Sequence, residues 1–180
     1  MYNDIMKDKI KKYSLHWALG GKDANGGLEQ NAYELEKLCE FINEKNIKTY
    51  TEIGCAAGQL LRFMRDEFEL DTTGITLEPR DTHKDLPIIH GSSRDPEIIK
   101  MAKPCDLYFI DGDHSYLGVK SDYLNYKGLC KYMAFHDILG QRDCEGVSQF
   151  WNEIRNEYEF IEFIDSNRDI ASGIGIIKII

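Results

Sequence analysis

The amino-acid sequence predicts an α/β protein in which helices cover both faces of a mainly parallel sheet. Short β-rich segments alternate with helical segments through most of the chain, and this order is typical of crossover connections between parallel strands. The last two β-rich segments are joined only by a short polar link, residues 165–173, which leaves no room for a crossover helix. These two segments should therefore pair antiparallel. With 180 residues, the chain is long enough for one domain with a buried core.

Two helical stripes and a glycine-rich stretch precede the sheet. Met6, Ile10, Tyr13 and Trp17 recur at helical spacing, and four glycines between residues 20 and 27 then bracket a polar loop. A second apolar stripe, from residue 28 to residue 42, predicts another helix. Two interpretations of residues 1–27 stay open: a lid that closes over a ligand, or a helix packed on the edge of the sheet. Residues 28–180 form the predicted main domain.

The remaining elements follow in alternation. Apolar and β-branched runs predict strands at 48–53, 73–78, 87–90, 106–110, 132–136, 159–164 and 174–179. Helical spacing predicts helices at 57–68, 96–102, 116–129 and 146–158. The last of these helices has the clearest apolar face, which includes Val147, Phe150, Trp151 and Ile154.

Composition excludes several classes of protein. Lysine and arginine number 22 and the acidic residues 31, so the net charge of −9 argues against a nucleic-acid partner. No apolar run approaches the ~18 residues that a membrane span needs, and the polar N-terminus does not resemble a secretory signal. The five cysteines include no Cys-x-x-Cys pair, and their odd number argues against a disulfide framework. We therefore expect a cytoplasmic protein in a reducing compartment.

Ligands of open α/β sheets bind at the carboxyl ends of the strands, so chemistry is expected there. Glu52, Gly54 and Gly58 surround the turn after the first strand, where the glycines permit a sharp bend and a close approach of the backbone. Glu78 closes the second predicted strand, where a carboxylate can accept hydrogen bonds from both hydroxyls of a ribose. Each feature alone also fits a plain turn or a solvated strand end.

The third and fourth strand ends add further polar residues. Ser92 and Ser93 follow the third strand, where small polar side chains either border an adenine or form a simple turn. The fourth strand ends in Phe-Ile-Asp-Gly-Asp-His-Ser-Tyr, residues 109–116, and the fifth in Ala-Phe-His-Asp-Ile, residues 134–138. Neighbouring strands would bring the acids and histidines of these two motifs to one mouth of the sheet.

Together these residues resemble the class I S-adenosylmethionine-dependent methyltransferases. Glu52, Gly54 and Gly58 match the Glu/Asp-x-Gly-x-x-x-Gly signature of that family, Glu78 its ribose-binding acid, and Ser92 or Ser93 its adenine-side position. The motifs of the fourth and fifth strands resemble a narrower branch of small O-methyltransferases, including methyltransferase family 24 and catechol-type enzymes. The resemblance implies a three-layer, Rossmann-like, seven-stranded, mostly parallel sheet with the last strand antiparallel, and S-adenosyl-L-methionine as the cofactor.

The resemblance also implies a metal site with one departure from the family pattern. Metal-dependent catechol-type enzymes place Asp and then Asp-Asn at these two strand ends, and the matching positions here are Asp111, His136 and Asp137. Oxygen ligands suit a hard cation such as Mg²⁺, whereas the imidazole of His136 favours a transition metal or no metal. The alternative is that Asp111 contacts the charged end of the cofactor and that His136 and Asp137 form a buried hydrogen-bonded pair.

The implied reaction is transfer of a methyl group to an oxygen, and this transfer needs a base or a metal. His114 is the first candidate for the base, because an imidazole titrates near neutral pH, and His136 is the second. Few elements are added to the core fold, so the expected acceptor is a small or sugar-like hydroxylated molecule in an open site. The other expectation is that a second subunit of a homodimer completes the site.

Two other classes of function stay open at this point. Asp111, Asp113 and Ser115 also resemble the Asp-x-Asp-x-Ser motif of haloacid-dehalogenase-like phosphatases, although that motif normally follows the first strand of the domain. A catalytically silent protein that binds the cofactor with the same fold is the alternative without chemistry. A calcium-binding loop is excluded, because Tyr116 occupies the position where that loop needs glycine.

Overall fold

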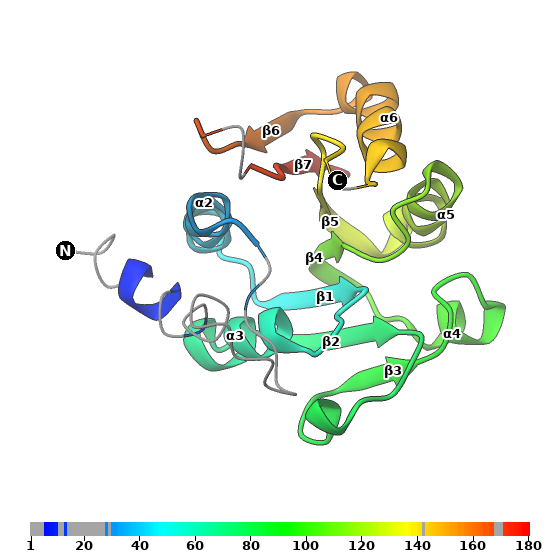
Figure 1. Ribbon diagram of the computed structural model, residues 1–180. Coiled ribbons are helices and arrows are strands. Elements are labelled where there is room, and N and C mark those ends of the chain that lie inside the picture. Colours follow the sequence, from blue (N-terminus) through cyan, green and yellow to red (C-terminus); the bar gives the residue numbers. More distant parts are fainter. Residues whose placement is uncertain (1–5, 11–12, 14–27, 29, 142, 168–170) are drawn as a thin grey trace.

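A seven-stranded sheet with strand order β3-β2-β1-β4-β5-β7-β6 forms the centre of the protein (Figure 1). The computed structural model describes residues 6–10, 13, 28, 30–141, 143–167 and 171–180. The strands are β1 Thr49–Ile53, β2 Asp71–Thr76, β3 Ile88–His90, β4 Cys105–Ile110, β5 Cys130–His136, β6 Phe160–Phe163 and β7 Ile174–Lys178. The strand β7 pairs antiparallel with both β5 and β6, and the other pairings are parallel. The predicted fold class is therefore confirmed, including the antiparallel last strand.

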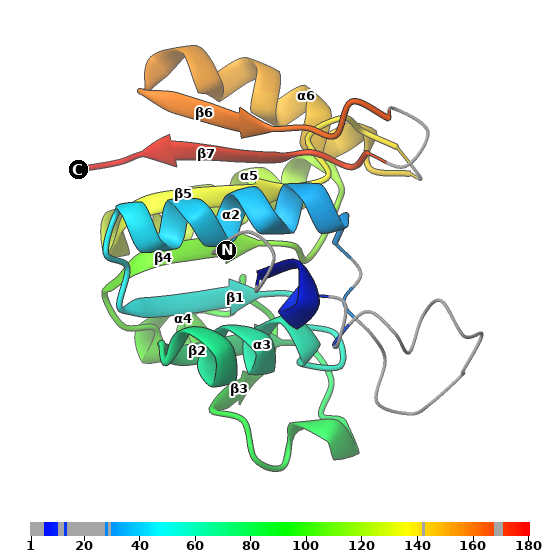
Figure 2. The same cartoon turned by 90° about the vertical axis from the view of Figure 1, so that its left-hand side faces the viewer.

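Helices cover both faces of this sheet and give three layers. The α-helices are α2 Ala32–Glu44, α3 Gln59–Phe68, α4 Pro96–Met101, α5 Tyr116–Tyr126 and α6 Glu145–Ile154. Short 3₁₀ helices follow at Asp81–His83, Lys127–Leu129 and Arg155–Glu157. Figures 1 and 2 show α2 and α3 on one face and α4, α5 and α6 on the other.

Alternation along the central strands divides the core into two clusters. In β4, Leu107 and Phe109 pack with α2 and α3, whereas Tyr108 and Ile110 pack with α5 and α6. This pattern follows from the two-residue period of a strand that is buried on both faces. The opposed helices hold the strand ends, and so the loops that follow them, in fixed positions.

Helix starts are marked by side chains that cap the first turn. Asn31 accepts hydrogen bonds from the amides of residues 33 and 34 at the start of α2. Asp95, followed by a proline, caps α4, and Ser115 caps α5 by accepting the Gly118 amide. These contacts satisfy backbone amides that have no partner inside the helix. The motif residues 111–114 therefore end in a helix start of fixed position.

The second strand differs from the prediction by two residues. It was expected at 73–78 but spans Asp71–Thr76, so Glu78 lies beyond its end. The register explains the difference, because Ile75 pairs with the last residue of β1 and Thr76 with the last residue of β3. Leu77 and Glu78 have no neighbouring strand to pair with, and Pro79 has no amide to donate.

The N-terminal segment is described only in part. Residues 6–10 are helical, and Met6 and Ile10 are buried in the cluster formed with α2 and α3. The ring of Tyr13 packs edge-on against Phe63, with 5.1 Å between the centroids. Trp17 and the glycine-rich stretch lie outside the described residues, so the boundary at residue 27 and the lid stay predictions.

Among the helices that the structure describes, none has both the length and the apolar composition that crossing a bilayer requires.

Candidate active site

A cavity of about 520 Å³ opens at the carboxyl ends of β1, β2, β3 and β4. Its lining comes from residues 52–57, 59–60, 75–77, 91–94 and 111–114, with Leu28 and Gln30 from the segment before α2. The strand order reverses between β1 and β4, which is the position where open α/β sheets bind ligands. The volume suits a small-molecule cofactor.

The loop between β1 and α3, residues 54–58, forms one wall of this cavity. Gly54 has φ of 90°, and a Cβ atom at this position would lie 2.1 Å from the carbonyl oxygen of Asp111. Gly58 has φ of 79° and begins α3, where a Cβ atom would lie 2.4 Å from a methyl group of Leu86. Both positions therefore require glycine, because a side chain would collide with the neighbouring strand end or segment. The sequence prediction of a sharp, close turn is confirmed.

Most residues predicted to bind the cofactor lie at this cavity. Glu52, Gly54, Ser92, Ser93 and Asp111 line it, and Gly58 caps the helix behind it. Glu52 is only 3% exposed, and one of its oxygens lies 3.5 Å from the Tyr50 hydroxyl, which donates to it.

Glu78 is the exception among these residues. Glu78 is exposed and is not among the residues that line the cavity. Thr76 and Leu77 line the cavity at the end of β2 instead. Thr76 and Leu77 were missed because the strand ends two residues earlier than predicted. Leu77 is 71% exposed, an apolar side chain at the mouth of a polar site.

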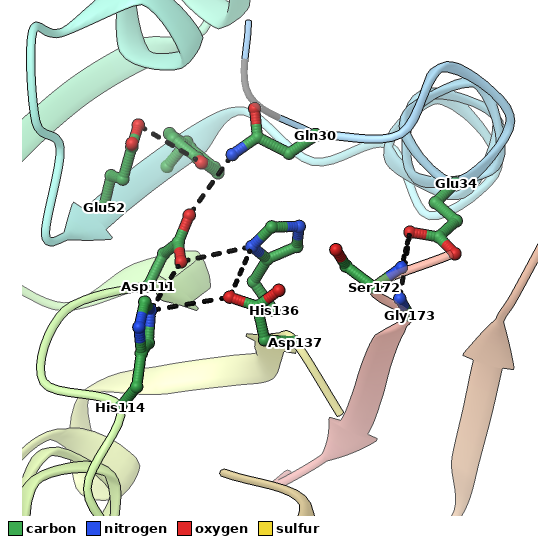
Figure 3. Close-up of polar contacts among 10 residues, drawn as sticks. Gln30, Glu34, Glu52, Asp111, His114, His136, Asp137, Ser172 and Gly173 are labelled. Atoms are coloured by element: carbon green, nitrogen blue, oxygen red, sulfur yellow. Dashed lines mark hydrogen bonds and ion pairs between the residues drawn. The ribbon is translucent and has the colours of Figure 1, made fainter. Parts of the chain in front are cut away.

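Asp111, at the end of β4, is the centre of a hydrogen-bonded cluster (Figure 3). Gln30 donates from Nε2 to Asp111 Oδ2 over 3.2 Å. The other carboxylate oxygen lies 3.1 Å from Nδ1 of His136 and 3.3 Å from Nε2 of His114. Burial alone would raise the pKa of Asp111, but the two imidazoles outweigh it and hold the pKa well below its ordinary value. Asp111 is therefore ionised at neutral pH.

His136 ends β5 and lies between two carboxylates. Its Nδ1 is 3.3 Å from Asp137 Oδ2 in addition to the contact with Asp111. Burial lowers the pKa of His136, but both carboxylates raise it, and the net pKa lies well above its usual value. The ring is 6% exposed, and its Nε2 has no hydrogen-bond partner among the described residues.

Asp137 and His114 complete the cluster. Asp137 has φ of 59°, a left-handed conformation that is uncommon for residues other than glycine, and its carboxylate points toward the two histidines. His114 Nε2 lies 3.5 Å from Asp137 Oδ2. The hydrogen bond to Asp111 raises the pKa of His114 despite partial burial. Its side chain is 38% exposed and borders the cavity, so His114 is the accessible histidine of the pair.

The donor atoms of this cluster have the spacing of a metal site. One ligand atom each from Asp111, His136 and Asp137 lies within 4.8 Å of the others, and these are the three residues predicted from the sequence. A second group within the same spacing contains His114, Asp137 and Cys144. Cys144, a buried residue just before α6, was not predicted, because only the fold brings it beside Asp137. Oxygen, nitrogen and sulfur donors together fit a transition metal better than Mg²⁺.

Asp113 does not have the surroundings of the acid in a phosphatase motif. Its carboxylate accepts a hydrogen bond from the Ser115 amide over 3.0 Å and pairs with Arg94 over 3.1 Å. The contacts with Ser115 lower the pKa of Asp113, whereas a general acid needs a raised one. Asp113 is thus a structural group at the start of α5.

Comparisons with known proteins identify the fold. No protein-family model matches the sequence, and no curated protein matches it either. Among solved structures, a protein from Staphylococcus aureus provisionally assigned as a caffeoyl-CoA O-methyltransferase is 18% identical with a TM-score of 0.63, and the match covers 95% of this chain and 99% of that one.

Two further solved structures are similar over nearly the whole chain. The O-methyltransferase TomG from Streptomyces achromogenes, in complex with S-adenosylmethionine, is 12% identical with a TM-score of 0.62 over 94% of this chain and 88% of its own. MycE, a methyltransferase of the mycinamycin pathway in complex with Mg and S-adenosylhomocysteine, is 15% identical with a TM-score of 0.61 over 94% of this chain and 53% of its own. The chain therefore has the fold of the S-adenosylmethionine-dependent O-methyltransferases.

Proposed function

We propose that this protein transfers a methyl group from S-adenosyl-L-methionine to an oxygen of a small hydroxylated acceptor. The main support for this proposal is that the cavity lies beside the hydrogen-bonded cluster of acids and histidines. The cavity at the switch point of the sheet is bordered by Asp111 and His114, which belong to the same hydrogen-bonded cluster as His136 and Asp137. A cofactor bound there would lie next to groups that can remove a proton.

The cofactor would bind along the strand ends. The loop 54–58 would let the cofactor approach the protein backbone closely, and Ser92 and Ser93 would border its adenine. Thr76 lines the cavity at the end of β2 and Glu78 does not, so we assign the ribose hydroxyls to Thr76 before Glu78. Leu77 supplies an apolar surface for a flat base at the mouth. The cofactor carries the reactive methyl group, and the protein supplies alignment.

His114 is the residue that we propose as the base. It is accessible from the cavity, and its Nε2 faces Asp111 and Asp137, which leaves Nδ1 to take the proton of the acceptor hydroxyl. The two carboxylates stabilise the imidazolium that results, as the raised pKa of His114 indicates. His136 is too deeply buried to contact an acceptor, so we assign it to holding Asp111 and Asp137.

Asp111, His136 and Asp137 would hold a divalent cation if the reaction uses one. A cation bound there would polarise the acceptor oxygen and lower its pKa. The ligand set, with Cys144 close to Asp137 in the second group, favours Mn²⁺, Co²⁺ or Zn²⁺ over Mg²⁺. Without a cation, the protonated His136 supplies the positive charge between the two carboxylates.

We also propose an acceptor, an assembly and a cellular compartment for the protein. A small or sugar-like molecule fits a site to which the fold adds few elements, and a second subunit of a homodimer would narrow it. The five cysteines all lie in the described part of the chain and form no disulfide there, and four of them are buried, in keeping with a reducing compartment such as the cytoplasm.

Thermal unfolding with and without ligands tests the proposal. S-adenosylhomocysteine should raise Tm in a concentration-dependent way, because a ligand that binds only the folded state stabilises it. Phosphate and vanadate should have no such effect. Stabilisation by the phosphate analogues alone would favour the phosphatase and contradict the proposal. Stabilisation by S-adenosylhomocysteine without methyl transfer to any hydroxylated acceptor tried would favour the silent cofactor-binding protein.

A further inference from the structure

His83 is a buried histidine outside the cluster described above. It ends the 3₁₀ helix Asp81–His83 in the connection between β2 and β3, and it is only 4% exposed. In sequence it falls in a polar stretch, where a histidine would normally face solvent. Its burial therefore requires partners for both ring nitrogens.

The contacts of the His83 ring define which nitrogen carries hydrogen. Nε2 lies 2.8 Å from the carbonyl oxygen of Ala56, which can only accept, so Nε2 donates. Nδ1 is then the acceptor in the neutral ring, and it receives the amide N–H of Arg80 over 3.3 Å. His90, at the end of β3, lies with its Nε2 3.3 Å from the same Nδ1 and donates to it. The two rings are stacked, with centroids 5.5 Å apart and planes inclined by 16°.

The acceptor of this hydrogen bond belongs to the loop that borders the cavity. We call residues 54–58 the cofactor loop; residues 54–57 line the cavity, and Gly58 caps α3 behind it. Ala56 has φ of 41°, between Gly54 and Gly58, which also have positive φ. A left-handed conformation is strained for alanine. The Gly58 amide donates to the Cys55 carbonyl across this turn, and the hydrogen bond from His83 adds a contact from outside the loop.

We propose that His83 is a positioning residue that holds the cofactor loop in its binding conformation. The hydrogen bond from Nε2 fixes the carbonyl of Ala56 and, through the rigid peptide, the direction of the Ala57 amide that follows it. The contact with His90 joins the loop to the end of β3, where residues 91–94 form another wall of the cavity. His83 thus links two walls of the cavity without lining it. This inference rests on the proposed function, because the ligand is taken to be the adenosyl cofactor.

A purely structural role for His83 is separable from this one. The segment around His83 is also held to α3 by Arg62, whose Nη2 donates to the Thr82 carbonyl over 2.9 Å and to Asp85 Oδ1 over 2.9 Å. Arg65 donates to the Asp85 carbonyl over 2.8 Å. Removing the Asp85 carboxylate therefore loosens the segment without removing the hydrogen bond to Ala56.

Replacing His83 by glutamine or by asparagine tests whether the hydrogen-bond donor or the volume of the ring matters. In His83→Gln, the terminal amide reaches about as far as Nε2 and can still donate to the Ala56 carbonyl. In His83→Asn, the same chemical group ends near the position of Nδ1 and falls short. The matched control is Asp85→Ala. Titration calorimetry with S-adenosylhomocysteine gives the affinity, and thermal unfolding without ligand gives Tm.

The expected result is a split between affinity and stability. His83→Asn should weaken S-adenosylhomocysteine binding ~10-fold, the loss that corresponds to one buried hydrogen bond. His83→Gln should stay within ~3-fold of the wild type, although both variants have similar Tm values. Asp85→Ala should lower Tm and leave the affinity unchanged.

Three results would overturn the inference. Wild-type affinity in His83→Asn would remove the need for the donor, and equal weakening in His83→Asn and His83→Gln would show that ring packing alone matters. Equal weakening in Asp85→Ala would make the segment, not the hydrogen bond, responsible. Failure of the wild type to bind S-adenosylhomocysteine is a distinct outcome, because it would overturn the proposed function and this inference with it.

Discussion

Replacing Glu34 should destabilise the protein and loosen the segment that supports Asp137. Glu34 lies in the first turn of α2, is fully buried, and accepts three backbone amides from the connection between β6 and β7. Figure 3 shows two of these contacts, those with Ser172 and Gly173. Oε1 accepts the amide of Asp165 over 3.1 Å, and Oε2 accepts those of Gly173 over 2.9 Å and Ser172 over 3.4 Å. This carboxylate therefore joins two segments that are more than 130 residues apart in the chain.

The effect extends to the active site through the backbone. The carbonyl oxygens of Ser172 and Gly173 accept the amides of Leu139 and Ile138 over 3.0 and 3.4 Å. These amides follow directly after Asp137, whose backbone is left-handed and whose carboxylate points toward the two histidines. Loss of Glu34 should loosen this support.

The contacts give the size of the expected loss. Hydrogen bonds to a charged group contribute about 1.5–3 kcal/mol each. In Glu34→Gln, the side-chain oxygen can still accept the amides of Ser172 and Gly173, whereas the hydrogen bond from the Asp165 amide is lost. Stability should therefore fall by about 2 kcal/mol. In Glu34→Ala, all three hydrogen bonds are lost, including the two short ones from Asp165 and Gly173, and the fall should reach about 4 kcal/mol.

Urea denaturation followed by circular dichroism measures these losses. The matched control is Glu40→Gln in the same helix, where the carboxylate pairs with Lys37 at the surface and removal should cost at most about 0.5 kcal/mol. A stability of Glu34→Gln within 0.5 kcal/mol of the wild type (roughly the effect of a surface pair) would refute the reasoning.

Three further predictions address the cavity, the cluster and a buried acid. Thr76→Val should weaken S-adenosylhomocysteine binding ~5-fold in calorimetry, the loss of one neutral hydrogen bond, whereas Glu78→Ala should stay near the wild type; the reverse order would return the ribose to Glu78. Mn²⁺ or Co²⁺ should raise Tm more than Mg²⁺, and Asp137→Asn should abolish this effect; no Tm response to any of the three ions would leave His114 to act without a metal. Burial raises the pKa of Asp122 to about 6, so the cost of its ionisation to folding begins near the ordinary pKa of 3.8, grows as the pH rises and is complete above about pH 6. Asp122→Asn should therefore stabilise the protein by about 3 kcal/mol at pH 8 and hardly at all near pH 3.5 in urea denaturation; equal effects at both pH values would contradict the raised pKa.

Much of the fold and of the candidate site was predictable because the relevant signals are local in sequence. Alternating strand and helix patterns gave the layers, and the short link before the last strand gave its antiparallel pairing. Asp111 and His114 come shortly after β4, and His136 and Asp137 lie at the end of β5. Because β4 and β5 are parallel neighbours, the sheet brings these residues together regardless of loop detail.

The features that were missed depend on contacts between distant segments. The end of β2 is set by the ends of β1 and β3, which sequence periodicity in β2 does not report, and this placed Thr76 instead of Glu78 at the cavity. Cys144 approaches the cluster only because the loop before α6 folds back beside Asp137. Likewise, the partners of the buried side chains of His83 and Glu34 are backbone groups of other segments.

A crystal structure of the protein with S-adenosylhomocysteine would show whether the cavity at the strand ends holds the cofactor. We expect the adenosine to lie between Leu77 and residues 111–113, with the sulfur atom directed toward His114. An adenosine elsewhere on the molecule would contradict the cofactor site. A sulfur atom directed away from Asp111 and His114 would contradict the claim that this cluster performs the chemistry.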